Sequence, residues 1–439
     1  MCLALAWKDI RFCNAEEQAR IAKEFLENQG RNLSDDAKVG FCLEVTLRYP
    51  KEMQKRFSDY PPLAQKRVVS PDEYSPFTKQ LIKRHKLKPS ATPKLVSDLR
   101  EKQHYKIHYS NLKYVLSLGV ELVAVHRVVR FQQKPWLKPY IDHNNRRRGE
   151  CSSASEKDFY KLKNNSCFGK LFEDPRKYQS IVLVRDANLF RRRVARIDFH
   201  SCMILNEDTA LVMMEKTVVH MRKPNYLGSI ILDRSKDIMM RFWYDNLLPT
   251  FQRPGSTASL CTTDTDSFVV GITYTDPRRS FYSDLASLAP CLDTSNYSDQ
   301  HPYFVKNMDQ FDHLKLMQRK NKGVLGKMKD ESGGDRFAIE GVFLKSKLYS
   351  ILFDDGQRKQ ACKGISKGVV HREINIDHYR RVVETLEPQR NKMRVLRSKQ
   401  HQLYMLEIDK CSLSLFDDKR YAVDRVHTLP FGHALASVE

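Results

Sequence analysis

The segment Thr263-Asp264-Thr265-Asp266-Ser267-Phe268-Val269-Val270 decides the fold. Together with its neighbours from Leu260 to Thr273 it predicts a strand, a tight turn and a second strand. Asp264 and Asp266 would then stand at the tip of a β-hairpin whose strands bury apolar side chains. Mg²⁺ accepts one or two such carboxylates and completes its shell with water and substrate phosphates. Both aspartates are candidate metal ligands, and a solvated polar turn is the alternative for so short a motif.

A second segment has side chains that could bind a nucleotide at helical spacing. Its sequence is Lys161-Leu162-Lys163-Asn164-Asn165-Ser166-Cys167-Phe168-Gly169-Lys170. Lys161, Asn165 and Phe168 follow one another at steps of four and three residues, so a helix places them on one face. A cation, an amide and an aromatic ring together can hold a nucleotide, because the cation binds phosphate and the ring packs against base or sugar. A surface helix with solvated lysines and a core phenylalanine is the alternative.

The charge balance indicates a polyanionic partner. The 439 residues include 75 Lys+Arg and 53 Asp+Glu, a formal net charge of +22. Such a charge attracts nucleic acid, although it also keeps a basic protein in solution. The ten cysteines are scattered without a CxxC pair, which predicts no zinc site and no disulfide framework and suits a reducing compartment. No apolar run approaches the ~20 residues that cross a bilayer, so we expect an intracellular protein, cytosolic or nuclear.

Hydrophobic periodicity predicts a mixture of helices and strands along the chain. The expected helices span 15–28, with Asn14 as N-cap, 108–118, most of 140–168, and 230–248. The expected strands include 41–49 and 120–131. Because these elements do not alternate as βαβ units, the predicted fold class is α+β.

The two motifs together resemble those of family B DNA polymerases. Lys161-x3-Asn165-Ser166-x-Phe168-Gly169 is similar to the family's fingers motif, a lysine, three residues and Asn-Ser-x-Tyr-Gly. Asp264-Thr265-Asp266-Ser267 is similar to the palm motif Tyr-x-Asp-Thr-Asp-Ser, in the same order and about 100 residues later. Lys347-Leu348-Tyr349 resembles the lysine-x-tyrosine motif that contacts the primer strand, and Lys363-Gly364-Ile365 resembles the Lys-Gly strand after it.

Other segments resemble a narrower group, the protein-primed polymerases of Polinton/Maverick mobile elements. These segments, which together cover nearly the whole chain, are 135–142, 293–297, 325–331, 414–421 and 431–433. The resemblance implies a right-hand polymerase fold with palm, fingers and thumb. It divides the chain into an N-terminal palm part with an insertion (1–130), fingers helices (131–180), palm with the catalytic hairpin (181–350) and a thumb region (351–439).

The resemblance also implies a role for each motif residue. The implied catalytic residues and metal ligands are Asp264 and Asp266. The implied nucleotide-binding residues are Lys161, Asn165, Phe168 and Arg147, and the implied residues that bind primer DNA are Lys347, Tyr349 and Lys363. The implied cofactor is Mg²⁺ or Mn²⁺, and the implied partners are primer-template DNA, dNTPs and a terminal protein as primer. The implied activity is DNA-directed DNA polymerisation, the extension of a primer with dNTPs by two-metal phosphoryl transfer in DNA replication.

The sequence departs from the family in two places. Thr262 stands where the palm motif begins with tyrosine. The family's other palm motif, Asp-x-x-Ser/Asn-Leu-Tyr, is missing, because Asp9 within Lys8-Asp9-Ile10-Arg11-Phe12 does not fit it. We therefore expect an N-terminally truncated polymerase that lacks the exonuclease domain and the first palm motif.

Without that carboxylate, two-metal catalysis should fall by orders of magnitude. The competing hypothesis is a catalytically inactive DNA-binding remnant of a mobile-element polymerase. A basic RNA-binding module has little support, since no RNA-recognition signature is present.

Overall fold

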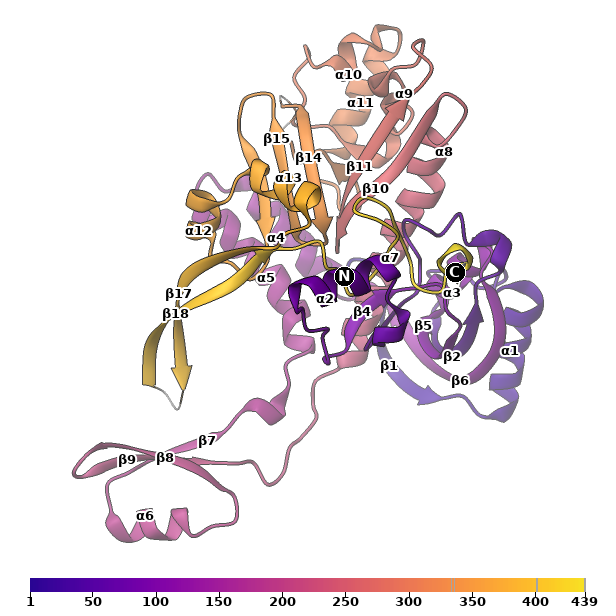
Figure 1. The fold of residues 1–439 in the computed structure, drawn as a ribbon. Coiled ribbons are helices and arrows are strands. Elements are labelled where there is room, and N and C mark those ends of the chain that lie inside the picture. Colours follow the sequence, from indigo (N-terminus) through magenta and orange to yellow (C-terminus); the bar gives the residue numbers. More distant parts are fainter. Residues whose placement is uncertain (333, 335, 400–401, 438–439) are drawn as a thin grey trace.

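The largest hydrophobic core lies on a four-stranded antiparallel sheet in this computed structural model, which describes residues 1–332, 334, 336–399 and 402–437 (Figure 1). The strands, in spatial order, are β1 (Leu5–Phe12), β6 (Glu121–Lys134), β2 (Val39–Arg48) and β5 (Lys102–His108). β2 lies between β6 and β5, and its alternate residues Leu43, Val45 and Leu47 are buried in this core. The predicted strands 41–49 and 120–131 are confirmed as β2 and β6, and the mixture of helices and strands confirms the α+β class.

Three helices complete this core: α1 (Ala15–Asn28), α3 (Tyr109–Ser117) and α7 (Asn225–Arg241). α1 has the predicted bounds. The Asn14 side chain accepts a hydrogen bond from the Glu17 N–H, and the Glu17 carboxylate accepts one from the Asn14 N–H, which together form a capping box at the start of the helix. Its buried residues Ile21 and Phe25 are one helical turn apart and face the sheet.

The N-cap of α3 is His108, which is buried and accepts a hydrogen bond from the Ser110 N–H through Nδ1. Burial lowers the pKa of His108 to about 3, and the nearby Arg234 contributes in the same direction. In the unfolded chain this histidine titrates near 6.5, so the unfolded state gains the proton first as the pH falls. We expect His108 to remove about 2 kcal/mol from the free energy of unfolding between about pH 7 and about pH 5.

Urea unfolding at the two pH values, followed by the fluorescence of the buried Trp243, measures this loss. His108→Asn is the matched control, because asparagine keeps an N-cap acceptor and does not titrate. The wild-type protein should lose about 2 kcal/mol more than His108→Asn over this interval. Equal losses in the two proteins would contradict the assignment to His108.

The chain between β2 and β5 forms a separate small lobe. It contains the strands β3 (Ala64–Arg67) and β4 (Lys94–Ser97), the helix α2 (Pro76–His85) and two short 3-10 helices, Lys51–Met53 and Pro71–Glu73. The C-terminal segment folds back on this lobe: the Phe431 carbonyl accepts from the Leu99 N–H at 2.9 Å, and the Phe431 ring lies 6.3 Å from that of Tyr74. This segment also contains the short pair β19 (Tyr421–Ala422) and β20 (Thr428–Leu429).

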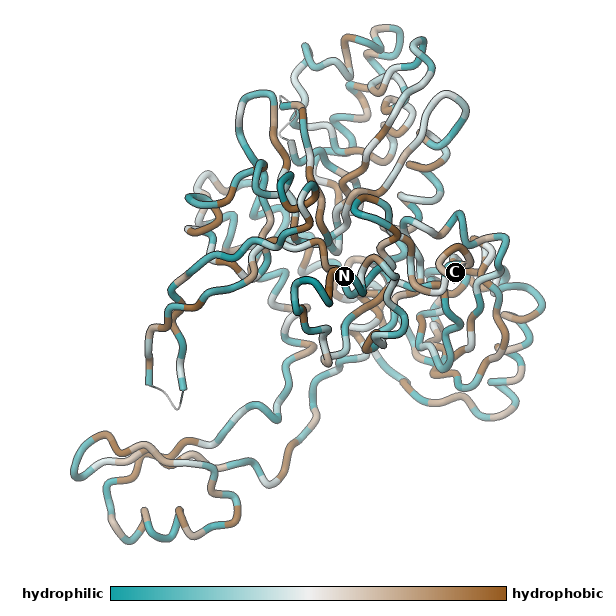
Figure 2. The backbone as a smooth tube through the Cα atoms, viewed as in Figure 1, coloured by the Kyte–Doolittle hydropathy of each residue, from teal (hydrophilic) through white to brown (hydrophobic). Residues whose placement is uncertain are grey.

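After β6 the chain forms a helical hairpin and then an arm that extends away from the rest of the molecule (Figure 1). The hairpin is α4 (Lys138–Glu150) and α5 (Ala154–Leu171), which confirms the predicted helical region. The arm has the strand order β7 (Ser180–Val184), β9 (Thr209–Met214) and β8 (Phe199–Asn206), with α6 (Ala187–Val194) packed on one face. Apolar residues recur along these strands in Figure 2 as they do in the central sheet.

The second half of the chain begins with the hairpin β10 (Ser256–Asp264) and β11 (Ser267–Tyr274). A helical group with its own small core follows: α9 (Phe281–Ala286), α10 (Pro302–Val305) and α11 (Phe311–Asn321), with the parallel pair β12 (Leu292–Asp293) and β13 (Met328–Lys329).

The remaining elements surround a third core. They are the sheet β14 (Ala338–Lys345), β15 (Leu348–Phe353) and β16 (Arg358–Cys362); the helices α12 (Lys367–Glu373) and α13 (Ile376–Thr385); and the long hairpin β17 (Gln389–Lys399) and β18 (Gln402–Leu413). The predicted boundary at residue 350 falls within β15. The domain roles implied by the resemblance stay predictions.

The helix predicted at 230–248 is longer and less regular than expected. α7 already begins at Asn225, and a π-helical turn (Phe242–Leu247) separates it from α8 (Leu248–Phe251). Pro249 explains the interruption, because proline has no N–H to donate and its ring would clash with the carbonyl four residues earlier.

The ten cysteines are all free in this structure. Within the described part of the chain, no helix is both long enough and apolar enough to span a membrane.

Candidate active site

The hairpin predicted around Asp264 and Asp266 is present. Asp264 and Ser267 form the last pair between β10 and β11, so Thr265 and Asp266 make a two-residue turn. The Asp264 carbonyl accepts from the Asp266 N–H at 2.6 Å and from the Ser267 hydroxyl at 3.2 Å. These bonds hold the turn closed and leave both carboxylates at its tip.

Thr265, between the two aspartates, is in a strained backbone conformation. Its φ of 59° lies in the left-handed region, which a β-branched residue rarely adopts. Such a residue costs of the order of 1–3 kcal/mol and persists where the surrounding structure enforces it, often at functional sites. The Thr265 hydroxyl donates to Asp264 Oδ1 at 3.2 Å, which ties the strained residue to the carboxylate.

Aromatic packing anchors the hairpin close to its turn, where Phe268 pairs with Thr263. The Phe268 ring lies 5.3 Å from that of Tyr60 and 5.5 Å from that of Trp243, and burial raises the pKa of Tyr60 to about 12. Beside them, Asp59 Oδ2 accepts from the Leu260 N–H at 3.0 Å. The hairpin is therefore held at its middle, through Leu260, and next to its turn, through Phe268. Asp59 was not among the predicted site residues, because no local sequence pattern distinguishes it from other exposed aspartates.

Lys347 lies against the tip of the hairpin. It occupies the turn between β14 and β15 with a φ of 62°, and its Nζ is 3.0 Å from Asp264 Oδ1. In the same turn the Ser346 hydroxyl is 3.5 Å from the Thr263 carbonyl, at the limit of a hydrogen bond. The structure thus brings together two residues, Asp264 and Lys347, that were singled out in separate motifs.

The other two residues predicted to contact the primer lie beside Lys347. The Lys363 N–H donates to the Lys347 carbonyl at 3.1 Å, and the Lys363 side chain is exposed. Tyr349 lies in β15 opposite Ala361 and is half-buried, with its ring 5.8 Å from that of Phe343. Lys363 is therefore attached through its backbone to Lys347, whose ammonium contacts the carboxylate hairpin.

The predicted nucleotide residues lie on α5, which is continuous through their positions. Lys161 and Asn165 are exposed, whereas Phe168 is half-buried with its ring 5.4 Å from that of Phe172. The Phe172 ring in turn packs against Gly228 of α7, where a Cβ atom would lie only 2.3 Å from the ring. This contact attaches the end of α5 to the beginning of α7.

The fourth predicted nucleotide residue, Arg147, is on α4. Its Nη1 lies 3.1 Å from Glu150 Oε2, and its Nε donates to the Tyr160 hydroxyl at 3.4 Å. Arg147 thus bridges α4 and α5, and its role in binding a nucleotide stays a prediction.

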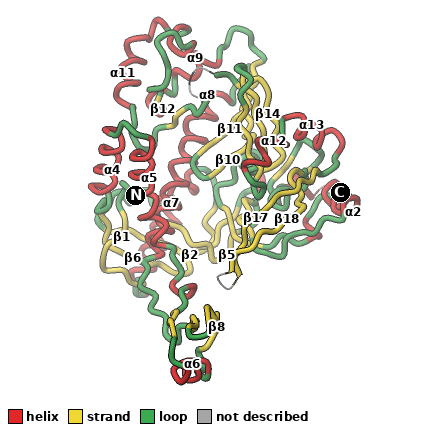
Figure 3. The backbone as a smooth tube through the Cα atoms, turned by 90° about the vertical axis from the view of Figure 1, so that its left-hand side faces the viewer, coloured by secondary structure: helices red, strands yellow, loops and turns green. Residues whose placement is uncertain are grey.

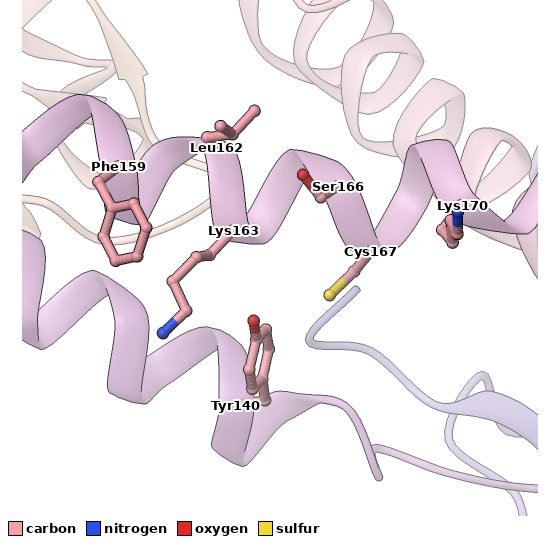
Figure 4. Close-up of a pocket in the computed structure, with 7 residues that line it drawn as sticks. All are labelled: Tyr140, Phe159, Leu162, Lys163, Ser166, Cys167 and Lys170. Atoms are coloured by element: carbon pink, nitrogen blue, oxygen red, sulfur yellow. The ribbon is translucent and has the colours of Figure 1, made fainter.

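A cavity of about 400 Å³ lies between α4 and α5 (Figure 4). Its lining residues are Tyr140, Phe159, Leu162, Lys163, Ser166, Cys167 and Lys170. At about 100° per residue, this face of α5 points roughly opposite to the face of Lys161, Asn165 and Phe168. The cavity therefore does not coincide with the predicted nucleotide site.

The hairpin and the predicted nucleotide residues belong to different parts of the structure. In Figure 3, helices α4, α5 and α7 group on one side and strands β10, β11 and β14 on the other. α7 connects them: its Gly228 meets Phe172, while Phe242 and Trp243 after its end pack on Phe268. Among the described residues, no hydrogen bond, ion pair or ring contact joins Lys161, Asn165 or Phe168 to the hairpin.

The donors at the hairpin are compatible with one hydrated Mg²⁺ or Mn²⁺ ion. Asp264 and Asp266 offer oxygen ligands, and Mg²⁺ is commonly held by one or two carboxylates plus water and phosphate. No group of three or more His, Cys, Asp or Glu placed to hold a metal occurs among the residues that the structure describes. Among the described residues, therefore, no third carboxylate joins Asp264 and Asp266 in a metal-binding group.

No protein-family model and no curated protein matches the chain by sequence. Among solved structures, the chain is similar to Phi29 DNA polymerase complexed with primer-template DNA, in the post-translocation binary complex. The TM-score is 0.42 at 10% identity, over 93% of this chain and 54% of the polymerase. For the ternary complex with primer-template DNA and incoming nucleotide substrates, the TM-score is 0.41 at 10% identity, over 93% and 55%. The chain spans about half the length of that polymerase.

Proposed function

We propose that this chain is a DNA-directed DNA polymerase module of the protein-primed family B kind, which extends a primer with dNTPs. The observation that carries the proposal is the contact between Lys347 and Asp264, 3.0 Å apart. It joins the motif that resembles a catalytic hairpin to the motif that resembles a primer contact. In this proposal the central sheet and the hairpin are the palm, α4 and α5 are the fingers, and residues 351–439 are the thumb.

Each group of residues then has a physical task. Lys347 and Lys363 bind backbone phosphates of the primer, a contact that is independent of base sequence and weakened by salt. Asp264 and Asp266 hold Mg²⁺, which when bound supplies positive charge against the charge that develops on the phosphoryl oxygens. Lys161 binds the phosphates of the incoming nucleotide. Because α5 and the hairpin are not joined in this structure, we propose that the α4–α5 pair moves toward the hairpin when a nucleotide binds.

The assignment to the Polinton/Maverick group, to priming by a terminal protein and to the nucleus belongs to the same proposal. Its support is the set of sequence segments that resemble this group, and the +22 net charge favours a nucleic-acid partner.

Primer extension tests the proposed activity. The purified chain is incubated with labelled primed template, dNTPs and Mg²⁺, with EDTA as the negative control. Extension that requires both Mg²⁺ and a template would support a polymerase. DNA binding without any extension would contradict it and favour the second candidate, an inactive DNA-binding remnant. The observation that favours this candidate is that, among the described residues, no third carboxylate joins Asp264 and Asp266 in a metal-binding group.

The two faces of α5 provide a matched pair of variants for the nucleotide site. We expect Lys161→Ala to raise the KM for dNTPs about 10- to 100-fold, because it removes one charge-assisted hydrogen bond to phosphate. Lys163→Ala removes the same charge from the cavity face and should leave this KM within about twofold of the wild-type value. Steady-state extension kinetics measure both values, and an equal rise in the two variants would contradict a nucleotide site at Lys161.

A further inference from the structure

Lys347 forms an ion pair with Asp264, and this pair is accessible to ligands. The side chains of Lys347 and Asp264 are 46% and 45% exposed. Exposed ion pairs are weak, because water competes for both charges and two mobile side chains must be held in place. A phosphate or a divalent cation that reaches this pair can therefore replace either partner.

The other lysine of this turn does not share that position. Lys345 Nζ donates to the Phe416 carbonyl at 2.6 Å and is thus directed to the C-terminal segment that packs on the β3–β4 lobe. Lys363 is close in the backbone, but no ion pair to Asp264 is present for it among the described residues. Within this cluster, Lys347 is the side chain that can alternate between the carboxylate and a second anion.

A divalent cation and the Lys347 ammonium compete at Asp264. The ammonium lies 3.0 Å from Oδ1, and the Thr265 hydroxyl already donates to the same oxygen at 3.2 Å. A metal ion bound there would stand within a few ångströms of the ammonium, and like charges at such a distance repel each other. Binding of the metal thus favours conformations in which Lys347 has left Asp264.

Primer DNA provides the second anion that Lys347 can bind. The neighbouring Lys363 adds a second positive charge, and the two lysines together attract a backbone phosphate. When Lys347 moves to a phosphate, Asp264 loses its counter-ion and becomes a stronger ligand for a cation. When a cation binds Asp264 first, Lys347 is released and becomes a stronger ligand for phosphate.

We propose that Lys347 is a shared counter-ion that couples primer-template binding to divalent-cation binding at Asp264, so that each ligand strengthens the binding of the other. This inference rests on the proposed function, because it uses the same metal and primer sites. Linkage requires that the factor be equal in both directions. Because the pair is exposed, we expect a factor near the lower end of common couplings, about fivefold.

The experiment measures both affinities without catalysis. Mn²⁺ binding is followed by the EPR signal of the free ion, with and without a primed duplex ending in a dideoxynucleotide, and the Mn²⁺ bound by DNA alone is subtracted. DNA binding is followed by fluorescence anisotropy with and without Mn²⁺ at constant ionic strength. The proteins compared are the wild type, Lys347→Met, Lys363→Met and Asp264→Asn.

In the wild type, DNA should lower the Kd for Mn²⁺ about fivefold, and Mn²⁺ should lower the Kd for DNA by the same factor. Lys347→Met keeps the length of the side chain and removes its charge, so the DNA-free protein should bind Mn²⁺ about fivefold more tightly and the coupling factor should fall to about one. Lys363→Met should weaken DNA binding but keep the wild-type coupling factor, because Lys363 is not paired with Asp264.

Two outcomes separate this inference from the proposed function. If Asp264→Asn abolishes Mn²⁺ binding while Lys347→Met keeps both the wild-type Mn²⁺ affinity and the wild-type coupling, the shared counter-ion is wrong and the metal site stands. If Asp264→Asn leaves Mn²⁺ binding unchanged in the free and DNA-bound proteins, the proposed metal site is wrong and the coupling falls with it. Coupling that disappears in Lys347→Met supports the inference even in a chain that extends no primer.

Discussion

Asp264→Asn lowers the rate of primer extension roughly 10²–10³-fold, because a carboxylate that holds a metal ion contributes several kcal/mol to the stability of the transition state. Asparagine has nearly the same shape, so the hairpin should keep its structure. The backbone bonds of the turn involve the Asp264 carbonyl and not its side chain. The loss should appear in the rate constant at saturating dNTP, since the substitution does not touch the predicted nucleotide face of α5.

Single-turnover extension of a primed template with Mg²⁺ measures this rate. Asp309→Asn is the control, since it removes an exposed carboxylate after α10, outside the hairpin. A loss of less than about tenfold in Asp264→Asn would show that the hairpin is not the metal site. A wild-type chain that binds DNA but has no measurable rate would instead favour the remnant.

Asp98→Asn destabilises the protein by about 3–5 kcal/mol, because it leaves the buried Lys102 without its counter-ion, whereas Arg67 keeps its ion pair with Glu73. Asp98 and Lys102 are fully buried and form an ion pair, and Arg67 Nε lies 2.7 Å from Asp98 Oδ2. Arg67 also lies 5.6 Å from the centre of the Phe431 ring. We therefore expect the C-terminal segment to lose its attachment to the β3–β4 lobe in this variant.

Urea unfolding measures the change in stability, and limited proteolysis measures the release of the C-terminal segment. Lys102→Met combined with Asp98→Asn is the matched test, because it removes the charge that Asp98→Asn leaves unpaired. The double variant should recover part of the stability lost in Asp98→Asn. A loss below about 1 kcal/mol in Asp98→Asn would contradict the importance of this buried network.

Local signals explain why some elements could be predicted closely. The bounds of α1 follow from Asn14, Glu17 and the spacing of Ile21 and Phe25, all of which lie within a few turns of one another. The carboxylate hairpin follows equally from a short apolar pattern on either side of Thr265. The predicted end of the helix at 230–248 was less accurate. The regular helix ends at Arg241, before a π-helical turn that precedes Pro249, and hydrophobic periodicity does not reveal this turn.

Features that depend on distant residues could not be predicted in this way. The order of strands β1, β6, β2 and β5 brings the beginning of the chain beside residues 121–134. The arm at 180–214 and the role of Asp59 as an anchor of β10 also depend on packing between segments far apart in the sequence. Periodicity describes which face of an element is apolar, but it does not say which other element covers that face.

The same distinction applies to the Asp264–Asp266 hairpin. Alternation of apolar and polar residues, two carboxylates and a tight turn were enough to locate the hairpin and its chemistry, because these signals lie within about a dozen residues. The contact of Lys347 with Asp264, the strained φ of Thr265 and the separation of the hairpin from α5 come from the folded chain. They arise from packing between β10, β14 and α7, and the energy of such long-range contacts is not encoded in any one segment of the sequence.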